Sequence, residues 1–122
     1  MRILIVDDSA LVRRGVRGLL SSEKTWEVCD EAADGADGLL KARELQPDII
    51  LLDVSMPGQN GLDTARALRQ EVPSAKILMM SQNDATQMLS GVIEAGAHGC
   101  VDKSRLSEDL LPAIKGIWGV AS

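Results

Sequence analysis

Residues 48–61 read DIILLDVSMPGQNG, and this stretch carries the pattern that indicates the fold. Residues 49–52 are all aliphatic, which is expected of a strand that is covered on both faces of a sheet. The run ends at the carboxylate of Asp53, and Met-Pro-Gly follows at residues 56–58. Ligand sites of open parallel sheets lie outside the carboxyl ends of the strands. The stretch therefore predicts a buried parallel strand that ends in a functional carboxylate.

Short apolar runs alternate with helical patterns along the rest of the chain. Further strands are predicted at 3–6, 26–29, 77–80 and 99–102. Helices are predicted at 9–22, 35–45, 62–71, 85–95 and, after an N-cap at Ser107, near the end of the chain. In the helix at 35–45 we expect Ala36, Leu39 and Leu40 to face inward. Strands that alternate with helices in this way predict one α/β domain, doubly wound around a parallel sheet.

The composition restricts the classes of function. The chain has 122 residues, a formal net charge of −5, two Trp, no Phe and no Tyr. An acidic surface without aromatic stacking partners argues against direct nucleic-acid binding by this domain. Two cysteines without a Cys-x-x-Cys pair, and a single His, exclude a closed zinc site and favour reduced thiols. No apolar run is long enough to span a membrane, so we expect a cytoplasmic domain.

Polar residues stand at the ends of four predicted strands: Asp7 and Asp8 at the first, Asp53 at the third, Ser81 at the fourth and Lys103 at the fifth. Three carboxylates at one edge repel one another unless a cation lies between them, and Mg²⁺ prefers carboxylate oxygens and water. A carboxylate such as that of Asp53 is an oxygen nucleophile that can form an aspartyl phosphate. Ser81 would then bind one phosphoryl oxygen, and Lys103 would neutralise another.

With these residues, the chain resembles the receiver domains of bacterial response regulators. The segments ILIVDDS, DIILLDVSMPGQNG, LMMS and EAGAHGCVDKS carry the resemblance, and the last is most similar to receivers of LuxR/NarL-type two-component regulators. The resemblance implies a flavodoxin-like (βα)5 fold with strand order 2-1-3-4-5. It also implies one receiver domain over residues 1–122, either free-standing or the N-terminal part of a longer regulator.

The resemblance implies a signalling function and a set of partners. A histidine kinase would transfer a phosphoryl group to Asp53 in the presence of Mg²⁺, and the change of conformation would regulate an output. That output would be transcription, through an attached or separate DNA-binding domain, with a homodimer formed on activation. Trp118 would then be either a core residue or a dimer contact. The domain would not be an enzyme, apart from its own phosphorylation by small donors and its own dephosphorylation.

The family's metal site maps onto this chain residue by residue. The resemblance implies that Asp8 and Asp53 bind Mg²⁺ through their carboxylates. The backbone carbonyl of Ser55 would complete the protein ligands, and Asp7 would assist through a water molecule. Ser81 would be the switch hydroxyl.

Several positions depart from the family pattern. Where the family usually has Tyr or Phe, three residues before Lys103, this chain has Cys100, so a rotating aromatic ring cannot serve as the switch. Gln82 replaces a small residue and would narrow access to the phosphoacceptor. Ser104 replaces a frequent Pro, so we expect a trans peptide after Lys103. Asp102 is atypical, and we expect it to add a negative charge near the strand end.

Two other functions remain open on the sequence. The first is a receiver that acts as a phosphorylation-independent interaction module. The departures from the family pattern at Cys100 and Gln82 leave this function open. The second is a Mg²⁺-dependent phosphohydrolase of the haloacid-dehalogenase type, which also uses an Asp nucleophile after a strand. Those enzymes carry a second Asp two residues later as general acid, and here that position is Ser55.

Overall fold

The computed structural model describes residues 1–54, 61–82 and 94–119, so Ser55 and most of the predicted helix at 85–95 lie outside the described residues. The strands are β1 (Arg2–Val6), β2 (Glu27–Ala32), β3 (Ile49–Asp53), β4 (Lys76–Ser81) and β5 (Gly99–Asp102). The helices are α1 (Ala10–Leu20), α2 (Gly35–Leu45), α3 (Gly61–Glu71) and α5 (Leu106–Gly119), with the 3₁₀ turn η1 (Lys103–Arg105) before α5.

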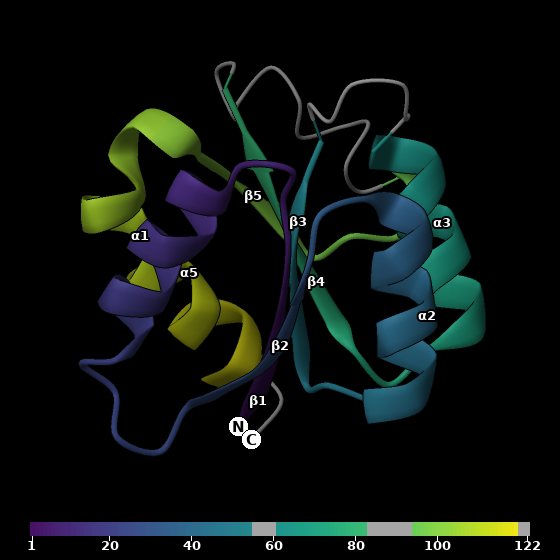
Figure 1. The fold of residues 1–122 in the computed structure, drawn as a ribbon, viewed down its shortest axis with the longest axis horizontal. Helices are drawn as coiled ribbons and strands as arrows, with labels where there is room; N and C mark the ends of the chain where they lie inside the picture. Colours follow the sequence, from purple (N-terminus) through teal and green to yellow (C-terminus); the bar gives the residue numbers. More distant parts are fainter. Residues whose placement is uncertain (55–60, 83–93, 120–122) are drawn as a thin grey trace.

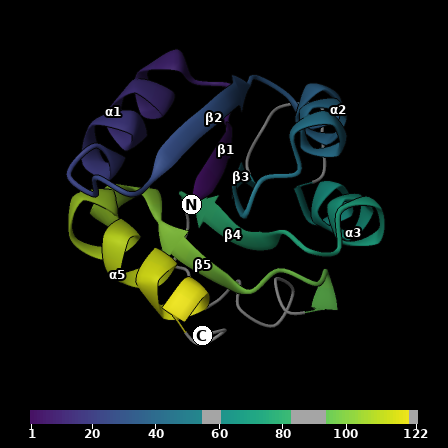
Figure 2. The ribbon, with the colours of Figure 1, turned by 90° about the horizontal axis from the view of Figure 1, so that it is seen from below.

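The five strands form one parallel sheet in the order β2-β1-β3-β4-β5, which confirms the predicted flavodoxin-like topology. Helices α1 and α5 cover one face of the sheet, and α2 and α3 lie on the other (Figures 1 and 2). The chain passes from β1 outward to β2 and then returns to β3 on the other side of β1. The strand order therefore reverses between β1 and β3, where open α/β sheets form their ligand crevice.

The core consists of two apolar layers, one on each face of the sheet. Alternate residues of the central strands belong to opposite layers, so that Ile50 and Leu52 pack on the α2 and α3 side while Ile49 and Leu51 pack on the α1 and α5 side. All five residues of β3 are buried. Because both of its faces are packed, β3 holds its last residue, Asp53, in a fixed place.

Strand β2 is longer than the apolar run at 26–29 predicted, since it continues to Ala32. It lies at one edge of the sheet and pairs only with β1, with Asp30 beside Leu4 and Glu31 beside Ile5. An edge strand is partly exposed and can carry charged side chains. The prediction ended the strand too early because it relied on apolar residues alone.

Helix α2 has the predicted bounds, but it buries a different set of residues: Gly35, Gly38 and Ala42. The prediction that Ala36, Leu39 and Leu40 would face inward is wrong, since Ala36 is exposed, Leu39 is only partly buried and Leu40 is 50% exposed. A Cβ atom on Gly38 would lie 2.9 Å from a methyl carbon of Val6. The helix therefore approaches β1 closely through its small residues, which a pattern of large apolar residues does not reveal.

The last helix begins at Leu106, after the turn η1, rather than after an N-cap at Ser107. Asp102 occupies the N-cap of the turn, and its side chain accepts a hydrogen bond from the Ser104 N–H. The helix buries Leu110, and Trp118 is 39% exposed. The Trp118 side chain is therefore only partly buried.

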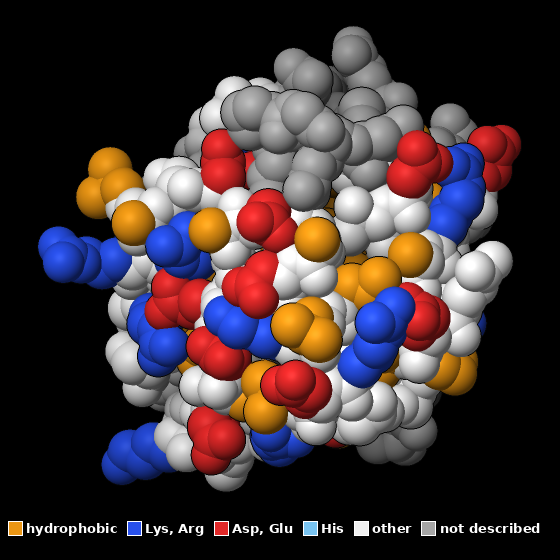
Figure 3. Space-filling model, turned by 45° about the vertical axis from the view of Figure 1, so that its right-hand side comes forward, with side chains coloured by type: hydrophobic (Ala, Val, Ile, Leu, Met, Phe, Trp, Pro, Cys, Tyr) orange, Lys and Arg blue, Asp and Glu red, His pale blue; other side chains and the backbone are white. Residues whose placement is uncertain are grey.

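Charges of both signs are interleaved on the face that Figure 3 shows. Helices α2 and α3 carry three ion pairs: Lys41–Asp37, Arg43–Glu71 and Arg66–Asp63. Such exposed pairs add little to stability. Across the described ranges, no helix has the length and apolar character needed to cross a membrane.

Gly61, at the start of α3, lies against the backbone of Val54, the residue that follows β3. A Cβ atom at this position would lie 2.5 Å from the Val54 Cα atom and 3.0 Å from the Val54 carbonyl oxygen. These are backbone atoms, which cannot turn aside as a flexible side chain can. The absence of a side chain at Gly61 therefore lets α3 start directly against the end of β3, beside Asp53.

We predict that Gly61→Ala lowers the free energy of unfolding by about 1–3 kcal/mol, because the added methyl group overpacks this contact. Gly15→Ala is the matched control: it lies within α1, where a Cβ atom would meet nothing within 4 Å. It should raise stability by up to about 1 kcal/mol, as expected of Ala in a helix. Urea denaturation of both variants measures the difference, and equal stability of Gly61→Ala and the unsubstituted protein would contradict the prediction.

Candidate acidic site at the carboxyl ends of the strands

Three carboxylates meet where β1 and β3 end. One oxygen atom from each of Asp7, Asp8 and Asp53 lies within 4.8 Å of the other two. Asp7 is 0% exposed and Asp53 is 1% exposed, whereas Asp8 faces solvent. The site therefore has a buried base and an open side through which water or a ligand can enter.

Asp7 is fixed by its own backbone and by the turn into α1. Its N–H donates to the Ala32 carbonyl oxygen of β2 at 3.0 Å, and its Oδ1 accepts from the Ser9 N–H at 2.9 Å. Its Oδ2 is fully buried and lies 2.8 Å from the Lys103 Nζ atom. One oxygen of Asp7 is thus engaged in shaping the turn, and the other is directed at the site.

The guanidinium of Arg13 binds the backbone of the same turn. It donates to the Asp7 carbonyl oxygen at 2.5 Å and to Glu31 Oε1 at 2.8 Å. Arg17 donates to the other oxygen of Glu31. The hydrogen bond from Arg17, followed by that from Arg13, keeps the pKa of Glu31 below its usual value although burial opposes this. An ionised Glu31 therefore orients Arg13, and Arg13 ties α1 and β2 to the backbone of the acidic turn.

Lys103 supplies a positive charge to the site. Its Nζ lies 2.8 Å from Asp7 Oδ2 and 3.1 Å from Asp53 Oδ2, and only 9% of its side chain is exposed. Burial acts to lower the pKa of Lys103, but hydrogen bonds to Asp7 and Asp53 outweigh it, and the pKa is raised. The side chain is therefore a protonated ammonium that bridges two buried carboxylates.

The chemistry of this site fits a divalent cation. The acidic triad Asp7, Asp8 and Asp53 is typical of the Mg²⁺-binding site of receivers. The buried Oδ2 of Asp7 is paired with the Lys103 ammonium at 2.8 Å, and a cation or its bound water would be a further partner for this oxygen. The exposure of Asp8 leaves room for the water molecules that Mg²⁺ retains.

Ser81 is the last residue of β4 and is 0% exposed. In the parallel register Met80 is opposite Asp53, so Ser81 extends one residue beyond Asp53 along the neighbouring strand. Gln82, next to it, is exposed. These positions agree with the predicted meeting of strand ends, while the role of Ser81 and the effect of Gln82 on access remain predictions.

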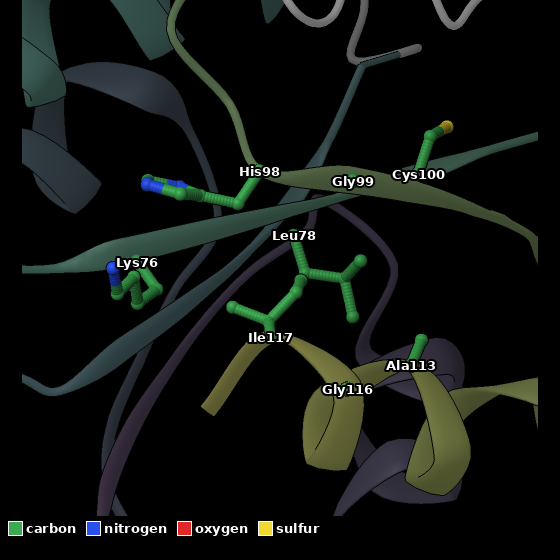
Figure 4. A pocket seen from close by; sticks show the side chains of 8 residues that line it. All are labelled: Lys76, Leu78, His98, Gly99, Cys100, Ala113, Gly116 and Ile117. Carbon is green, nitrogen blue, oxygen red and sulfur yellow. The ribbon is translucent and has the colours of Figure 1, made fainter. Parts of the chain in front are cut away.

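Cys100 lies on β5, opposite Met79, and is partly buried. It packs against the apolar layer on the α2 and α3 side. Figure 4 shows its thiol pointing away from Leu78 and Ile117, which lie on the other side of β5. Burial, and then the nearby Asp102, raise the pKa of the Cys100 thiol. The position therefore carries a small neutral thiol at the edge of the sheet.

A separate hollow of about 650 Å³ lies between β5 and α5. Leu78 and Ile117 form part of its apolar wall, and Lys76 and His98 contribute polar groups (Figure 4). His98 is exposed, and its Nδ1 accepts a hydrogen bond from the Ile77 N–H at 3.1 Å. None of the three clustered carboxylates lines this hollow. It is therefore distinct from the acidic site.

Arg13 and Glu31 support the acidic turn, but neither was predicted from the sequence as a site residue. A signal existed for Arg13, since it follows the helix cap Ser9 by one turn, and side chains of a helix point back toward its N-terminus. Glu31 gave no such signal, because the expected strand ended at residue 29. Glu31 reaches the site through the pairing of β2 with β1, which joins residues that are far apart in the sequence.

The match to known proteins defines the family. The response regulator receiver domain matches residues 3–115, which cover the five strands except for Arg2 at the start of β1. The chain therefore belongs to the response regulator receiver domains. It is a receiver of two-component signal transduction rather than a classical enzyme.

Relatives and solved structures agree with this assignment. The chain is 44% identical over 114 residues to the nitrate/nitrite response regulator protein NarP of Escherichia coli strain K12, covering 93% of the chain and 53% of NarP. A LuxR-family two-component response regulator from Aurantimonas superposes with a TM-score of 0.90 at 36% identity, covering 97% of this chain and 84% of that one. RcsB from Salmonella enterica, bound to promoter rprA in the presence of the phosphomimetic BeF3⁻, gives a TM-score of 0.86 at 26% identity, covering 97% and 98%. The chain spans about half the length of the curated relatives it matches.

We predict that Lys103→Met lowers the free energy of unfolding by about 3–5 kcal/mol, because it leaves buried carboxylates without their cation. Adding Asp53→Asn should recover part of the lost stability, because it removes one of the two carboxylates that Lys103 no longer neutralises. Lys115→Met is the control: its ion pair with Glu23 is exposed on the Lys side, and its removal should cost less than about 1 kcal/mol. Urea denaturation without divalent cations makes the comparison, and similar losses from the two Lys substitutions would count against the bridging role.

Proposed function

We propose that this receiver accepts a phosphoryl group from a histidine kinase onto Asp53. The observation that carries the proposal is the placement of a 1% exposed carboxylate at the end of a fully buried strand, facing the Lys103 ammonium and two further carboxylates. Phosphoryl transfer depends mainly on positioning and on neutralisation of charge. The site offers both.

In this reaction an oxygen of Asp53 attacks phosphorus while the bond from phosphorus to the donor breaks. The donor leaves with the electron pair of that bond: an imidazole nitrogen when the donor is a kinase phosphohistidine, or acetate when it is acetyl phosphate. One negative charge on Asp53 becomes nearly two on the phosphorylated side chain. Lys103 would pair with the added charge, and the Ser81 hydroxyl would donate to a phosphoryl oxygen.

Mg²⁺ is the cofactor that this donor set suits best. Asp8 and Asp53 would bind it directly, Asp7 through water, and the backbone carbonyl of Ser55, outside the described residues, would complete the protein ligands. The bound ion would neutralise negative charge on the phosphoryl oxygens. Because the Asp7 turn is held by Arg13 and Ser9, the carboxylates keep their separation before the ion arrives.

We further propose that the output is transcription, in the cytoplasm, through a DNA-binding domain. The support is the length of the curated relatives, of which this chain spans about half, and the binding of RcsB to a promoter. On this proposal residues 1–122 form the receiver part of a longer regulator, and activation brings two copies together. The partly exposed Trp118 is a candidate contact in that dimer.

A second candidate function is a receiver that recognises its partner without phosphorylation. One observation favours it: Cys100 provides no aromatic ring to report on the state of Ser81. The acidic triad and its ammonium speak against it, because buried like charges are costly to keep without a use. We therefore place it second.

The proposed function predicts one phosphoryl adduct on the intact protein after incubation with Mg²⁺ and acetyl phosphate. Intact-mass analysis should show this adduct, and it should disappear without Mg²⁺ and in Asp53→Asn. Asp63→Asn is the matched control, since Asp63 is an exposed carboxylate of α3 paired with Arg66, and it should leave the adduct intact. Absence of any adduct, with acetyl phosphate and with a phosphorylated kinase alike, would overturn the proposal in favour of the phosphorylation-independent module.

A further inference from the structure

Residues 102–104 form a closed turn around Lys103, and the contacts of the acidic site do not account for it. Asp102 Oδ1 accepts two hydrogen bonds from Ser104, one from its N–H at 2.9 Å and one from its hydroxyl at 2.8 Å. Lys103 is the residue enclosed between them. This is an Asx turn, in which an Asp side chain takes the place of a backbone carbonyl two residues before the donor.

The turn lies at the junction between β5 and α5. Asp102 is the last residue of β5, paired with Ser81 of β4, and its backbone is extended, with φ −83° and ψ 127°. The turn η1 starts at Lys103 and leads into α5 at Leu106. The backbone direction therefore changes at Lys103, and the Asx turn fixes that change on both sides of the residue.

Asp102 does not join the acidic cluster, which among the described residues consists of Asp7, Asp8 and Asp53. Asp102 is the last residue of β5, so its charge lies near the strand end as expected, but its carboxylate is directed along its own chain to Ser104. The described residues contain no cis peptide bond, so the Lys103–Ser104 peptide is trans, as predicted. The N–H that a Pro at position 104 would lack is the donor that closes the turn.

The position of the Lys103 ammonium depends on this backbone. Its Nζ reaches Asp7 and Asp53 at 2.8 and 3.1 Å from the end of a long side chain with four rotatable bonds in its stem. A change in the backbone angles at Lys103 would move the ammonium away from both carboxylates. Groups that must meet a ligand within a few tenths of an ångström need such support from neighbouring residues.

We propose that Asp102 and Ser104 are positioning residues, which set the Lys103 ammonium for the phosphoryl group through the Asx turn that encloses it. The proposal rests on the proposed function, in which Lys103 pairs with that group on Asp53. Asp102 acts here as a hydrogen-bond acceptor rather than as a charge. The acceptor oxygen, and not the negative charge, is therefore what a substitution must preserve.

The test uses beryllofluoride, which stands in for the phosphoryl group on a carboxylate, and measures its dissociation constant in saturating Mg²⁺. Asp102→Ala should weaken binding by roughly tenfold, the effect of misplacing one charge-assisted hydrogen bond. Asp102→Asn keeps an Oδ1 acceptor and should stay within about twofold of the unsubstituted protein. Asp109→Ala, which removes a carboxylate paired with Arg105 on α5, is the control for charge and should have no effect.

Two further measurements separate positioning from a general loss of structure. In a Lys103→Met background, Asp102→Ala should bring no additional weakening, because its effect passes through the ammonium. The Mg²⁺ dissociation constant, by calorimetry without beryllofluoride, should be unchanged in Asp102→Ala, since the proposed metal-binding carboxylates stand at the ends of β1 and β3. Equal weakening by Ala and Asn, or an added loss in the Lys103→Met background, would overturn the proposal.

The outcomes also distinguish this proposal from the function on which it rests. If the unsubstituted protein binds neither beryllofluoride nor a phosphoryl group, the proposed function fails and the positioning role fails with it. If the unsubstituted protein binds and Asp102→Ala binds equally well, only the positioning role is overturned.

Discussion

The Lys103 ammonium lies between Asp7 and Asp53, 2.8 Å from one carboxylate oxygen and 3.1 Å from the other. These groups stand at the ends of three strands of one sheet, with Asp7 directly after β1, Asp53 last in β3 and Lys103 directly after β5. Because β1 and β3 are neighbours with every inward face packed, their two acidic ends cannot move apart to relieve repulsion. A cation is required there, and the fold supplies one from β5. The site is therefore built around the Lys103 ammonium, which on the proposed function would pair with a phosphoryl group on Asp53.

Much of this arrangement could be predicted from the sequence because it depends on strand ends. Apolar runs locate β1, β3, β4 and β5, and parallel topology then places Asp7, Asp53, Ser81 and Lys103 at one edge. The supports of the site could not be predicted in this way. Glu31 reaches Arg13 only through the pairing of an edge strand whose end carries acidic residues, and α2 packs through Gly38 rather than through its large side chains. Both features arise from contacts between distant segments.

Two departures from the family pattern have different physical consequences. At position 100 a small thiol replaces a ring, so a signal from Ser81 has no aromatic side chain to move at that point of β5. At positions 102 and 104 the chain gains hydrogen bonds, since the Asp102 side chain closes a turn around Lys103. The first change removes the aromatic ring that the resemblance to the family implies for the switch. The second supports the site itself, which favours a receiver whose phosphoryl chemistry is retained.

A crystal structure grown with Mg²⁺ and beryllofluoride tests the central claim most directly, through the partners of the Lys103 Nζ atom. The account predicts beryllium bonded to an Asp53 carboxylate oxygen, with the ammonium donating to a fluorine atom at roughly 2.7–3.2 Å. Retention of the Asp7–Lys103–Asp53 bridge, with no beryllofluoride on Asp53 under saturating conditions, would contradict it.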